Sequence, residues 1–165
     1  DAGAIVYGQI FCGMGSNFTI AGHGVLCGSI YDRYADTIVP VSITNAHDFT
    51  IRDITILDPS AWTVNLYKCK NAVIDNVKII GARSNSDGIT MQNVENVLVQ
   101  NCFVRSWDDN LVVKGYNGNV DGVTCRNCIL WTDLAQSCEI GYETRAQFIR
   151  NITFEDITVL HSFHI

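Results

Sequence analysis

The chain has 165 residues, of which 47% are hydrophobic and 17% are charged, and its formal net charge at pH 7 is −6. This length suffices for one domain with a sizeable core, and this composition is that of a folded chain rather than a disordered one. The negative charge argues against nucleic acid as a partner, and the absence of any run of about 18 apolar residues argues against a membrane span.

A sequence repeat dominates the chain after a glycine-rich start that predicts short strands. In each copy, Asp or Asn is followed by an apolar, a variable and a second apolar residue, in steps of 23, 25, 26 and 29 residues. The residues are mainly Val, Ile and Thr, and no apolar stripe of helical period persists. Stacked repeats of this length, each alternating with a period of two, indicate a β-solenoid. The five copies are residues 52–56, 75–79, 100–104, 126–130 and 155–159.

The Asp or Asn of each copy has a structural explanation, because these residues tolerate the left-handed backbone of a tight corner. Their stacked side chains can also hydrogen-bond along the solenoid axis. We therefore expect a ladder of Asp53, Asn76, Asn101, Asn127 and Asp156.

The predicted fold class is all-β: a single-stranded, right-handed parallel β-helix of about six coils. We expect one domain over residues 1–165, forming a fragment of a longer or uncapped β-helix. Open ends of a solenoid expose apolar surface and strand edges, so self-association through these ends is also expected.

A second set of strands places three carboxylates together. The matching segments are residues 63–66, 88–91, 110–113 and 138–141, so Asp87 and Asp109 precede equivalent strands of neighbouring coils. Such strands lie ~4.8 Å apart, and Asp108 is adjacent. Strict alternation would turn both aspartates toward the core. We therefore expect a bend just before each strand, which Gly88 makes feasible.

Three clustered carboxylates suit the hydrolysis of glycosides. Neighbouring like charges raise the pKa of one carboxyl, which then holds the proton for the leaving oxygen while another activates water. An inverting enzyme separates acid and base by ~6.5–9.5 Å, and two coils can supply that separation. The alternative interpretation is that these aspartates are ordinary turn residues.

Seven cysteines are present, an odd number that cannot all pair within one chain. Cys125 and Cys128 have the spacing of metal ligands, but no second pair follows to complete a zinc site. We expect the cysteines to be small buried hydrophobic residues, and we predict no metal and no cofactor.

These motifs resemble the polygalacturonase family, glycoside hydrolase family 28, over roughly residues 17–160. The resemblance is carried by Asn85-Ser86-Asp87-Gly88, by Asp108-Asp109 before a Val-rich strand that ends in Lys114-Gly115, and by residues 58–62 and 139–143. It implies a right-handed parallel β-helix that cleaves polysaccharides such as pectin with inversion, outside the cytoplasm in the extracellular space or the periplasm. It also implies Asp108 as proton donor, Asp87 and Asp109 as the residues that hold and deprotonate water, and Asn85 as a residue that shapes the site.

Two family motifs differ in this chain. The Gly-His-Gly motif aligns with Ala135-Gln136-Ser137, and no Arg-Ile-Lys motif occurs before Ile165. The alternative substrate is a neutral glucan, because residues 157–161 are similar to the dextranases of family 49.

Substrate contacts and rival functions complete the hypotheses from the sequence. The aromatic ring of Trp107 can stack on sugar rings beside the aspartates. A Ca²⁺-dependent polysaccharide lyase is one rival, since Asp87, Asp108, Asp109 and Glu139 offer oxygen ligands. A non-catalytic sugar-binding β-helix is the other. The substrate-binding candidates are Asn85, Trp107, Lys114, Glu139 and Arg145.

Overall fold

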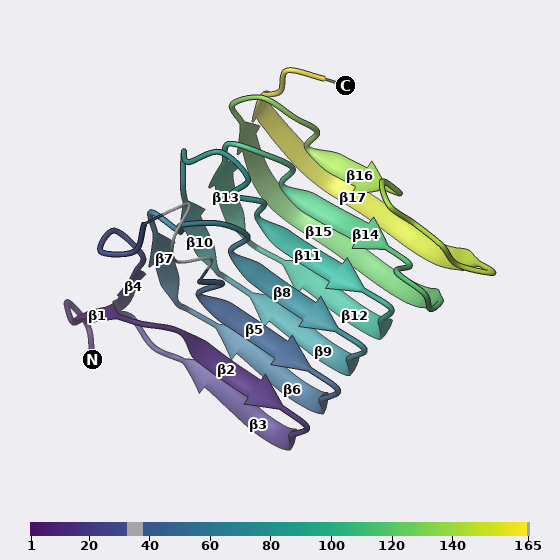
Figure 1. Ribbon diagram of the computed structural model, residues 1–165, viewed down its shortest axis with the longest axis horizontal. Helices are drawn as coiled ribbons and strands as arrows, with labels where there is room; N and C mark the ends of the chain where they lie inside the picture. Colours follow the sequence, from purple (N-terminus) through teal and green to yellow (C-terminus); the bar gives the residue numbers. More distant parts are fainter. Residues whose placement is uncertain (33–37, 165) are drawn as a thin grey trace.

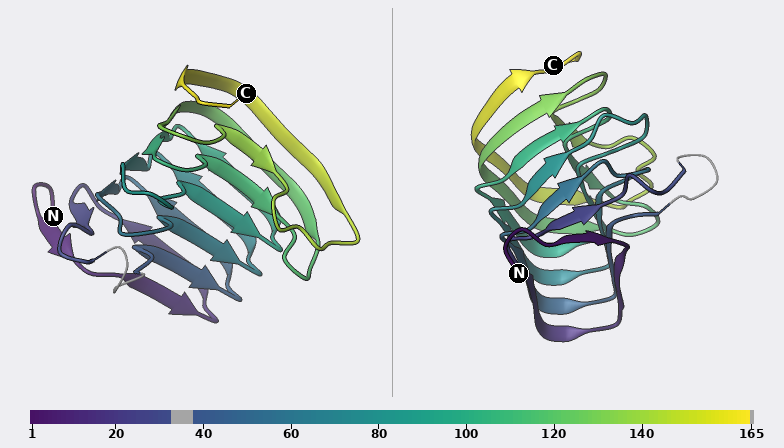
Figure 2. Two further views of the ribbon diagram at one scale, coloured as in Figure 1. Left: turned by 45° about the horizontal axis from the view of Figure 1, so that its top comes forward. Right: turned by 90° about the vertical axis from the view of Figure 1, so that its left-hand side faces the viewer.

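The computed structural model describes residues 1–32 and 38–164, which wind into a right-handed parallel β-helix (Figures 1 and 2). The strands of successive coils pair in parallel, and the described residues form strands, turns and bends without a helix. Consequently no described segment is a helix that could cross a membrane. The fold class predicted from the sequence is confirmed.

One strand from each of six coils forms the first sheet, in the order β16-β14-β11-β8-β5-β2. In its last pair, Leu111 is the register partner of Cys138, so the predicted match of residue 110 with residue 138 is wrong by one residue. The predicted register would have pointed Glu139 toward the core, whereas in the observed register it pairs with Val112 on the outward face. The strands are β2 (Ile10–Gly13), β5 (Val41–Thr44), β8 (Val64–Tyr67), β11 (Ile89–Gln92), β14 (Leu111–Lys114) and β16 (Cys138–Ile140).

The second sheet has eleven strands in the order β1-β4-β7-β10-β13-β15-β12-β9-β6-β3, with β17 paired to β15. It consists of two ladders, which the long strands β15 and β17 join because each runs through both. The first ladder holds β1 (Ile5–Tyr7), β4 (Val25–Cys27), β7 (Thr55–Leu57), β10 (Lys78–Ile80) and β13 (Phe103–Ser106). The remaining strands are β3 (Ser16–Ala21), β6 (His47–Arg52), β9 (Lys70–Asp75), β12 (Glu95–Gln100), β15 (Val120–Thr132) and β17 (Ile149–His161).

The register of these strands confirms the sequence repeat. Equivalent positions of the repeat pair from one coil to the next along the first ladder. The spacing in sequence between successive partners equals that between successive copies of the repeat. The partners in order are Thr55, Lys78, Phe103, Ile129 and Thr158.

Apolar side chains fill the interior as columns that run along the axis. Ile43, Leu66, Met91 and Val113 pair in register on successive coils of the first sheet, and each is fully buried. A single repeat could not bury these side chains, so the core exists only because the coils stack.

The predicted corner ladder is present in part. All five of its residues adopt a left-handed backbone, with φ between 49° and 62°. The amide of Asn76 donates to Asp53 over 2.8 Å and that of Asn127 donates to Asn101 over 2.7 Å. Asn101 instead donates to Asp75, because the adjacent carboxylate is within its reach.

A second ladder occupies another corner, which we did not predict. Asn71 donates to Asp48 over 2.8 Å, and Asn96 donates to Asn71 over 2.9 Å. All three residues have positive φ, as the first ladder does. Each corner thus combines a left-handed residue with a side-chain bond between coils.

All seven cysteines are free thiols, and five of them are buried: Cys27, Cys69, Cys102, Cys125 and Cys128. Four of these five belong to the main apolar cluster of the core, the exception being Cys27. These five behave as the small buried hydrophobic residues that the sequence predicted. The prediction is wrong for Cys12, which is partly exposed, and for Cys138, which is exposed, because both lie on the edge strands of the first sheet.

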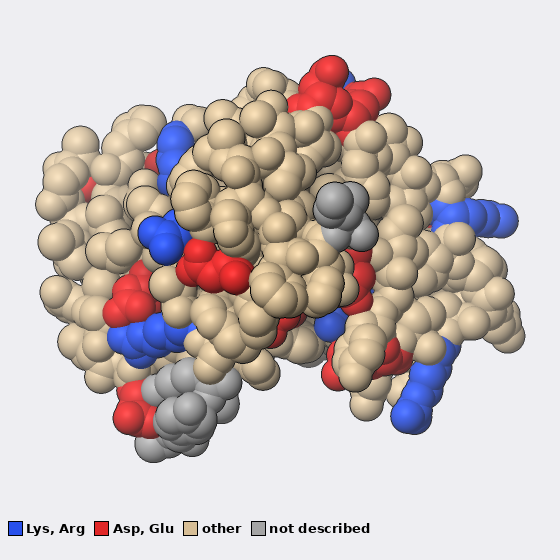
Figure 3. All heavy atoms as spheres, turned by 90° about the horizontal axis from the view of Figure 1, so that it is seen from above, with Lys and Arg blue, Asp and Glu red and all other residues tan. Residues whose placement is uncertain are grey.

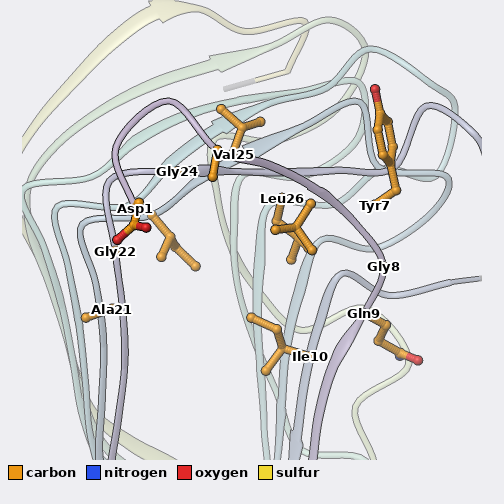
Figure 4. A pocket seen from close by; sticks show the side chains of 13 residues that line it. Asp1, Tyr7, Gly8, Gln9, Ile10, Ala21, Gly22, Gly24, Val25 and Leu26 are labelled. Atoms are coloured by element: carbon orange, nitrogen blue, oxygen red, sulfur yellow. The ribbon is translucent and has the colours of Figure 1, made fainter.

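The interior is incompletely covered at both ends of the solenoid. At the N-terminal end an apolar hollow is lined by Val6, Ile10, Val25 and Leu26, among others (Figure 4). At the other end the side chains of β17 that pack on the core stay partly exposed in the described part of the chain. They are Ile149, Ile152, Phe154 and Ile157.

Candidate active site

Asp87 and Asp109 lie at matching points of two neighbouring coils. Ile89 of β11 pairs with Leu111 of β14, which places each aspartate two residues before its strand. The N–H of Gly88 donates to the carbonyl of Asp109 over 2.8 Å. The structure therefore brings together the residues of the two aspartate motifs that are separate in the sequence.

A bend before each strand turns these aspartates away from the core. Asn110 is fully buried and donates to the carbonyls of Val104 and Trp131, so its side chain points inward. A Cβ added to Gly88 would lie 2.4 Å from both Val104 Cγ1 and the Asn110 carbonyl oxygen, so the position of Gly88 also faces inward. Leu111, the next residue, belongs to the core as well. Two successive inward positions break the alternation, so the residue before them faces outward, as the sequence analysis expected.

Hydrogen bonds fix the loop of Asp108 and Asp109. The hydroxyls of Ser106 and Thr132 donate to the carbonyl of Asp108 over 2.7 and 2.8 Å. The N–H of Asp109 donates to Asp108 Oδ1 over 3.1 Å, and the N–H of Gln136 donates to Asp109 Oδ1 over 2.9 Å. The backbone of the next coil thus holds the Asp109 carboxylate through the N–H of Gln136.

Burial and like charge favour protons on this cluster. Asp87 is 5% exposed, and burial, followed by the charge of Asp108, raises its pKa to about 8. Asp108 is more exposed, and burial together with the charge of Asp109 also raises its pKa. At neutral pH the unliganded site therefore holds protons that isolated carboxylates would release.

Glu139 adds a fourth carboxylate to the cluster. It pairs in register with Val112 on the outward face of the first sheet. Burial and then a hydrogen bond with the Asp109 carboxyl raise the pKa of Glu139 to about 7. The raised pKa of Glu139 favours a protonated carboxyl near neutral pH.

Lys114 is a cation whose charge acts on this cluster, and it is 4% exposed. Its Nζ lies 3.2 Å from Glu143 Oε2 and 4.6 Å from the centre of the Trp62 ring. Its charge lowers the pKa of Asp87, Asp108 and Glu139, opposing the larger effect of burial. Sequence reasoning did not identify Trp62 and Glu143 as its partners, since both lie on other coils.

The remaining predicted contact residues lie at different distances from the cluster. Asn85 is exposed on the loop before Asp87. Trp107 is partly exposed, and its backbone N–H donates to Ser86 Oγ over 3.2 Å. The backbone of Arg145 forms an isolated β-bridge with that of Tyr116, which lies beyond the C-terminal end of β14. Six residues of extended chain separate Asp109 from Gly115, or about 20 Å. The structure therefore does not bring Arg145 to the aspartates.

No set of three or more His, Cys, Asp or Glu within residues 1–32 and 38–164 is arranged to hold a metal ion. Within the cluster Glu139 is hydrogen-bonded to Asp109, and the carboxylates of Asp108 and Asp109 accept backbone N–H groups. This arrangement suits proton transfer.

The chain is similar to known proteins in sequence and in fold. Residues 33–163 match the family model described as Glycosyl hydrolases family 28. Isopullulanase of Aspergillus niger is 28% identical over 96% of this chain and 31% of its own length. An exopolygalacturonase of Zea mays is 29% identical over 66% of this chain and 30% of its own length. The chain thus spans less than a third of the length of these relatives.

A solved structure supports the architecture. The chain is similar to an exopolygalacturonase from Thermotoga maritima, with a TM-score of 0.55 and 15% identity over 77% of this chain and 39% of that one. At this identity the similarity shows the fold alone.

Proposed function

Because the chain belongs to glycoside hydrolase family 28, we propose that it hydrolyses an O-glycosidic bond of a polysaccharide with inversion. The observation that carries this proposal is the cluster of Asp87, Asp108 and Asp109 on two neighbouring coils. One carboxyl of such a cluster can hold the proton for the leaving oxygen while another takes a proton from water.

The aspartates take different roles in this reaction. Asp108 donates the proton, because its pKa is raised and it is more exposed than Asp87. Asp109 takes the proton from the attacking water, and Asp87 holds that water from its buried position. Since the pKa of Asp87 is about 8, Asp87 is a hydrogen-bond donor to the water at neutral pH.

Neighbouring side chains orient the sugar. Asn85 shapes the entrance of the site, and the ring of Trp107 stacks on a sugar beside the aspartates. Lys114 and Glu139 contact sugar hydroxyls, and Arg145 contacts a more distant part of a long chain. Because polysaccharides are degraded outside the cytoplasm, we place the protein in the extracellular space or the periplasm.

Asp108→Asn tests the function. This variant should release reducing ends at a rate about 10²–10⁴-fold below that of the original chain, because it cannot donate the proton. Asp156→Asn is the matched control: Asp156 is exposed at a corner with φ of 51°, which Asn tolerates. Its rate should not change, and NMR of the first product should show the inverted anomer. Full activity of Asp108→Asn would refute the mechanism.

We also propose that copies of the chain associate through the ends of the solenoid. The apolar hollow at the N-terminal end and the partly exposed core residues of β17 support this association, since burying them removes apolar surface from water. Sedimentation should then show a mass that rises with concentration above 18.3 kDa. A constant monomer mass would refute it.

A further inference from the structure

The backbone ladder between two neighbouring coils is interrupted beside the aspartates. The N–H of Leu134 donates to the carbonyl of Trp107 over 2.9 Å, and the N–H of Asn110 donates to the carbonyl of Gln136 over 3.0 Å. Between these two bonds, no backbone hydrogen bond joins the two coils in the part of the chain that the structure describes. The interruption covers residues 108–109, so the position of these two residues relative to the next coil depends on side chains.

The hydroxyl of Thr132 spans this interruption. It donates to the carbonyl of Asp108 over 2.8 Å and accepts the N–H of Ala135 over 3.0 Å. The carbonyl of Trp107 lies farther away, at 3.3 Å, and a hydroxyl has one proton, which is therefore directed to Asp108. Thr132 is fully buried, so water does not compete for either bond.

Each bond of this hydroxyl leads to one carboxyl of the proposed mechanism. The first bond holds the backbone of Asp108, the proton donor. The second bond holds Ala135, and the next N–H along the chain, that of Gln136, donates to Asp109 Oδ1 over 2.9 Å. One hydroxyl thus connects the backbone of the acid with the segment that holds the carboxylate of the base.

The strand register explains how Thr132 reaches this point. Thr132 is the last residue of β15, and it pairs with Ser106, the last residue of β13. Ser106 Oγ also donates to the carbonyl of Asp108, but Ser106 and Asp108 belong to the same coil. On the other side, His161 Nδ1 lies 2.7 Å from the carbonyl oxygen of Thr132. Thr132 therefore provides the contact between coils, and β17 supports it from behind.

Surface charge does not replace this contact. Lys and Arg side chains on the face seen in Figure 3 are scattered and form no single patch. Arg105 lies 3.4 Å from Asp133 of the same segment, but both side chains are partly exposed, so solvent weakens the pair. Asp133 also accepts the Nε1–H of Trp131 over 2.7 Å. These contacts hold the start of the segment, before Ala135.

We infer that Thr132 is a positioning residue that sets the separation between the proton donor Asp108 and the base Asp109, an inference that rests on the proposed glycosidase function. Inverting hydrolysis requires ~6.5–9.5 Å between acid and base so that water fits between them. A displacement of about 1 Å can lower a rate about 100-fold. Thr132 acts through these two residues and does not contact the sugar itself.

Thr132→Val tests the inference, because valine keeps the shape of the side chain and removes its hydroxyl. The substrate is whichever of polygalacturonan, pullulan and dextran the original chain cleaves fastest. We expect kcat to fall about 10- to 100-fold and KM to change less than about 2-fold, since the reacting groups are displaced and the sugar contacts stay. Thr132→Ser keeps the hydroxyl and should keep at least about half of the original kcat.

Thr63→Val is the matched control. Its Oγ1 is also fully buried but has no hydrogen-bond partner, so its removal should leave kcat unchanged. Full kcat in Thr132→Val, a loss confined to KM, or an equal loss in Thr63→Val overturns the inference. Should valine at position 132 prevent folding, Thr132→Ser decides, because a folded serine variant with less than about a tenth of the original kcat also overturns it.

Hydrogen exchange provides a readout that does not require turnover. Amide exchange over residues 133–137, followed by mass spectrometry, should be faster in Thr132→Val than in the original chain or in Thr63→Val, because the N–H of Ala135 loses its acceptor. Unchanged exchange overturns the inference. Asp108→Asn tests the glycosidase function separately, since it leaves the bonds of Thr132 in place: full activity of that variant refutes the mechanism without altering the exchange.

Discussion

Replacing Gly88 with alanine should both destabilise the solenoid and displace the aspartate cluster. The new Cβ would lie 2.4 Å from the Asn110 carbonyl oxygen and 2.4 Å from Val104 Cγ1, about 1 Å inside van der Waals contact. Neither atom is the end of a flexible side chain, since one belongs to the backbone and the other to a fully buried valine. The strain should therefore reach about 3 kcal/mol, the upper end of the usual cost of overpacking.

The assay is thermal unfolding together with release of reducing ends. For a chain of this length, about 3 kcal/mol corresponds to a fall in melting temperature of about 6–12 °C. Activity should fall more steeply than stability, because Asp87 is the neighbour of the displaced residue. Gly22→Ala is the control: nothing lies within 4 Å of its added Cβ, so its melting temperature should be unchanged. A Gly88→Ala chain with the original stability and activity would refute the steric reasoning and the inward assignment of this position.

Further expectations concern protonation and the corners. The folded pKa values of Asp87 and Glu139 are about 8 and 7, above their ordinary 3.8 and 4.5. The folded chain therefore keeps protons that the unfolded chain releases, so the free energy of unfolding should fall as pH rises from about 4 to about 8. Urea unfolding at pH 5 and 8 measures this, Asp87→Asn should reduce the difference, and a flat profile would contradict it. Lys114→Met removes a charge that lowers the pKa of Asp87, so the pH dependence of hydrolysis should move to higher pH; an unshifted profile would exclude that coupling. Asn76→Ala should cost about 1–2 kcal/mol for its left-handed backbone and lost bond, and Asn76→Gly should cost less, as urea unfolding can measure; equal losses would show that the backbone conformation is irrelevant.

The fold was largely predictable because its cause is local and repeated. Every copy of the repeat needs a residue that tolerates positive φ, and Asp53, Asn76 and Asn101 provide it at regular steps. The second corner had the same signal in Asp48, Asn71 and Asn96, whose spacings of 23 and 25 residues equal those of the first corner. The same pattern of an apolar, a variable and a second apolar residue follows them, so the signal was present in the sequence and was overlooked. The register of β16 was placed one residue off, which put Glu139 at the inward position of Leu111; the alternation of Cys138, Glu139 and Ile140 would have placed the glutamate outward.

The sequence by itself determined that the chain coils and that residues one coil apart become neighbours, since the repeat period sets both. It therefore paired Asp87 with Asp109. The tertiary structure decided how far each carboxyl is buried, and this burial, more than neighbouring charge, sets the pKa of Asp87. It also decided which residues two coils apart meet, as Trp62 and Lys114 do, because side-chain direction at a bend does not follow from alternation. Proximity along the axis follows from a period, whereas burial and orientation depend on what the surrounding coils pack around each residue.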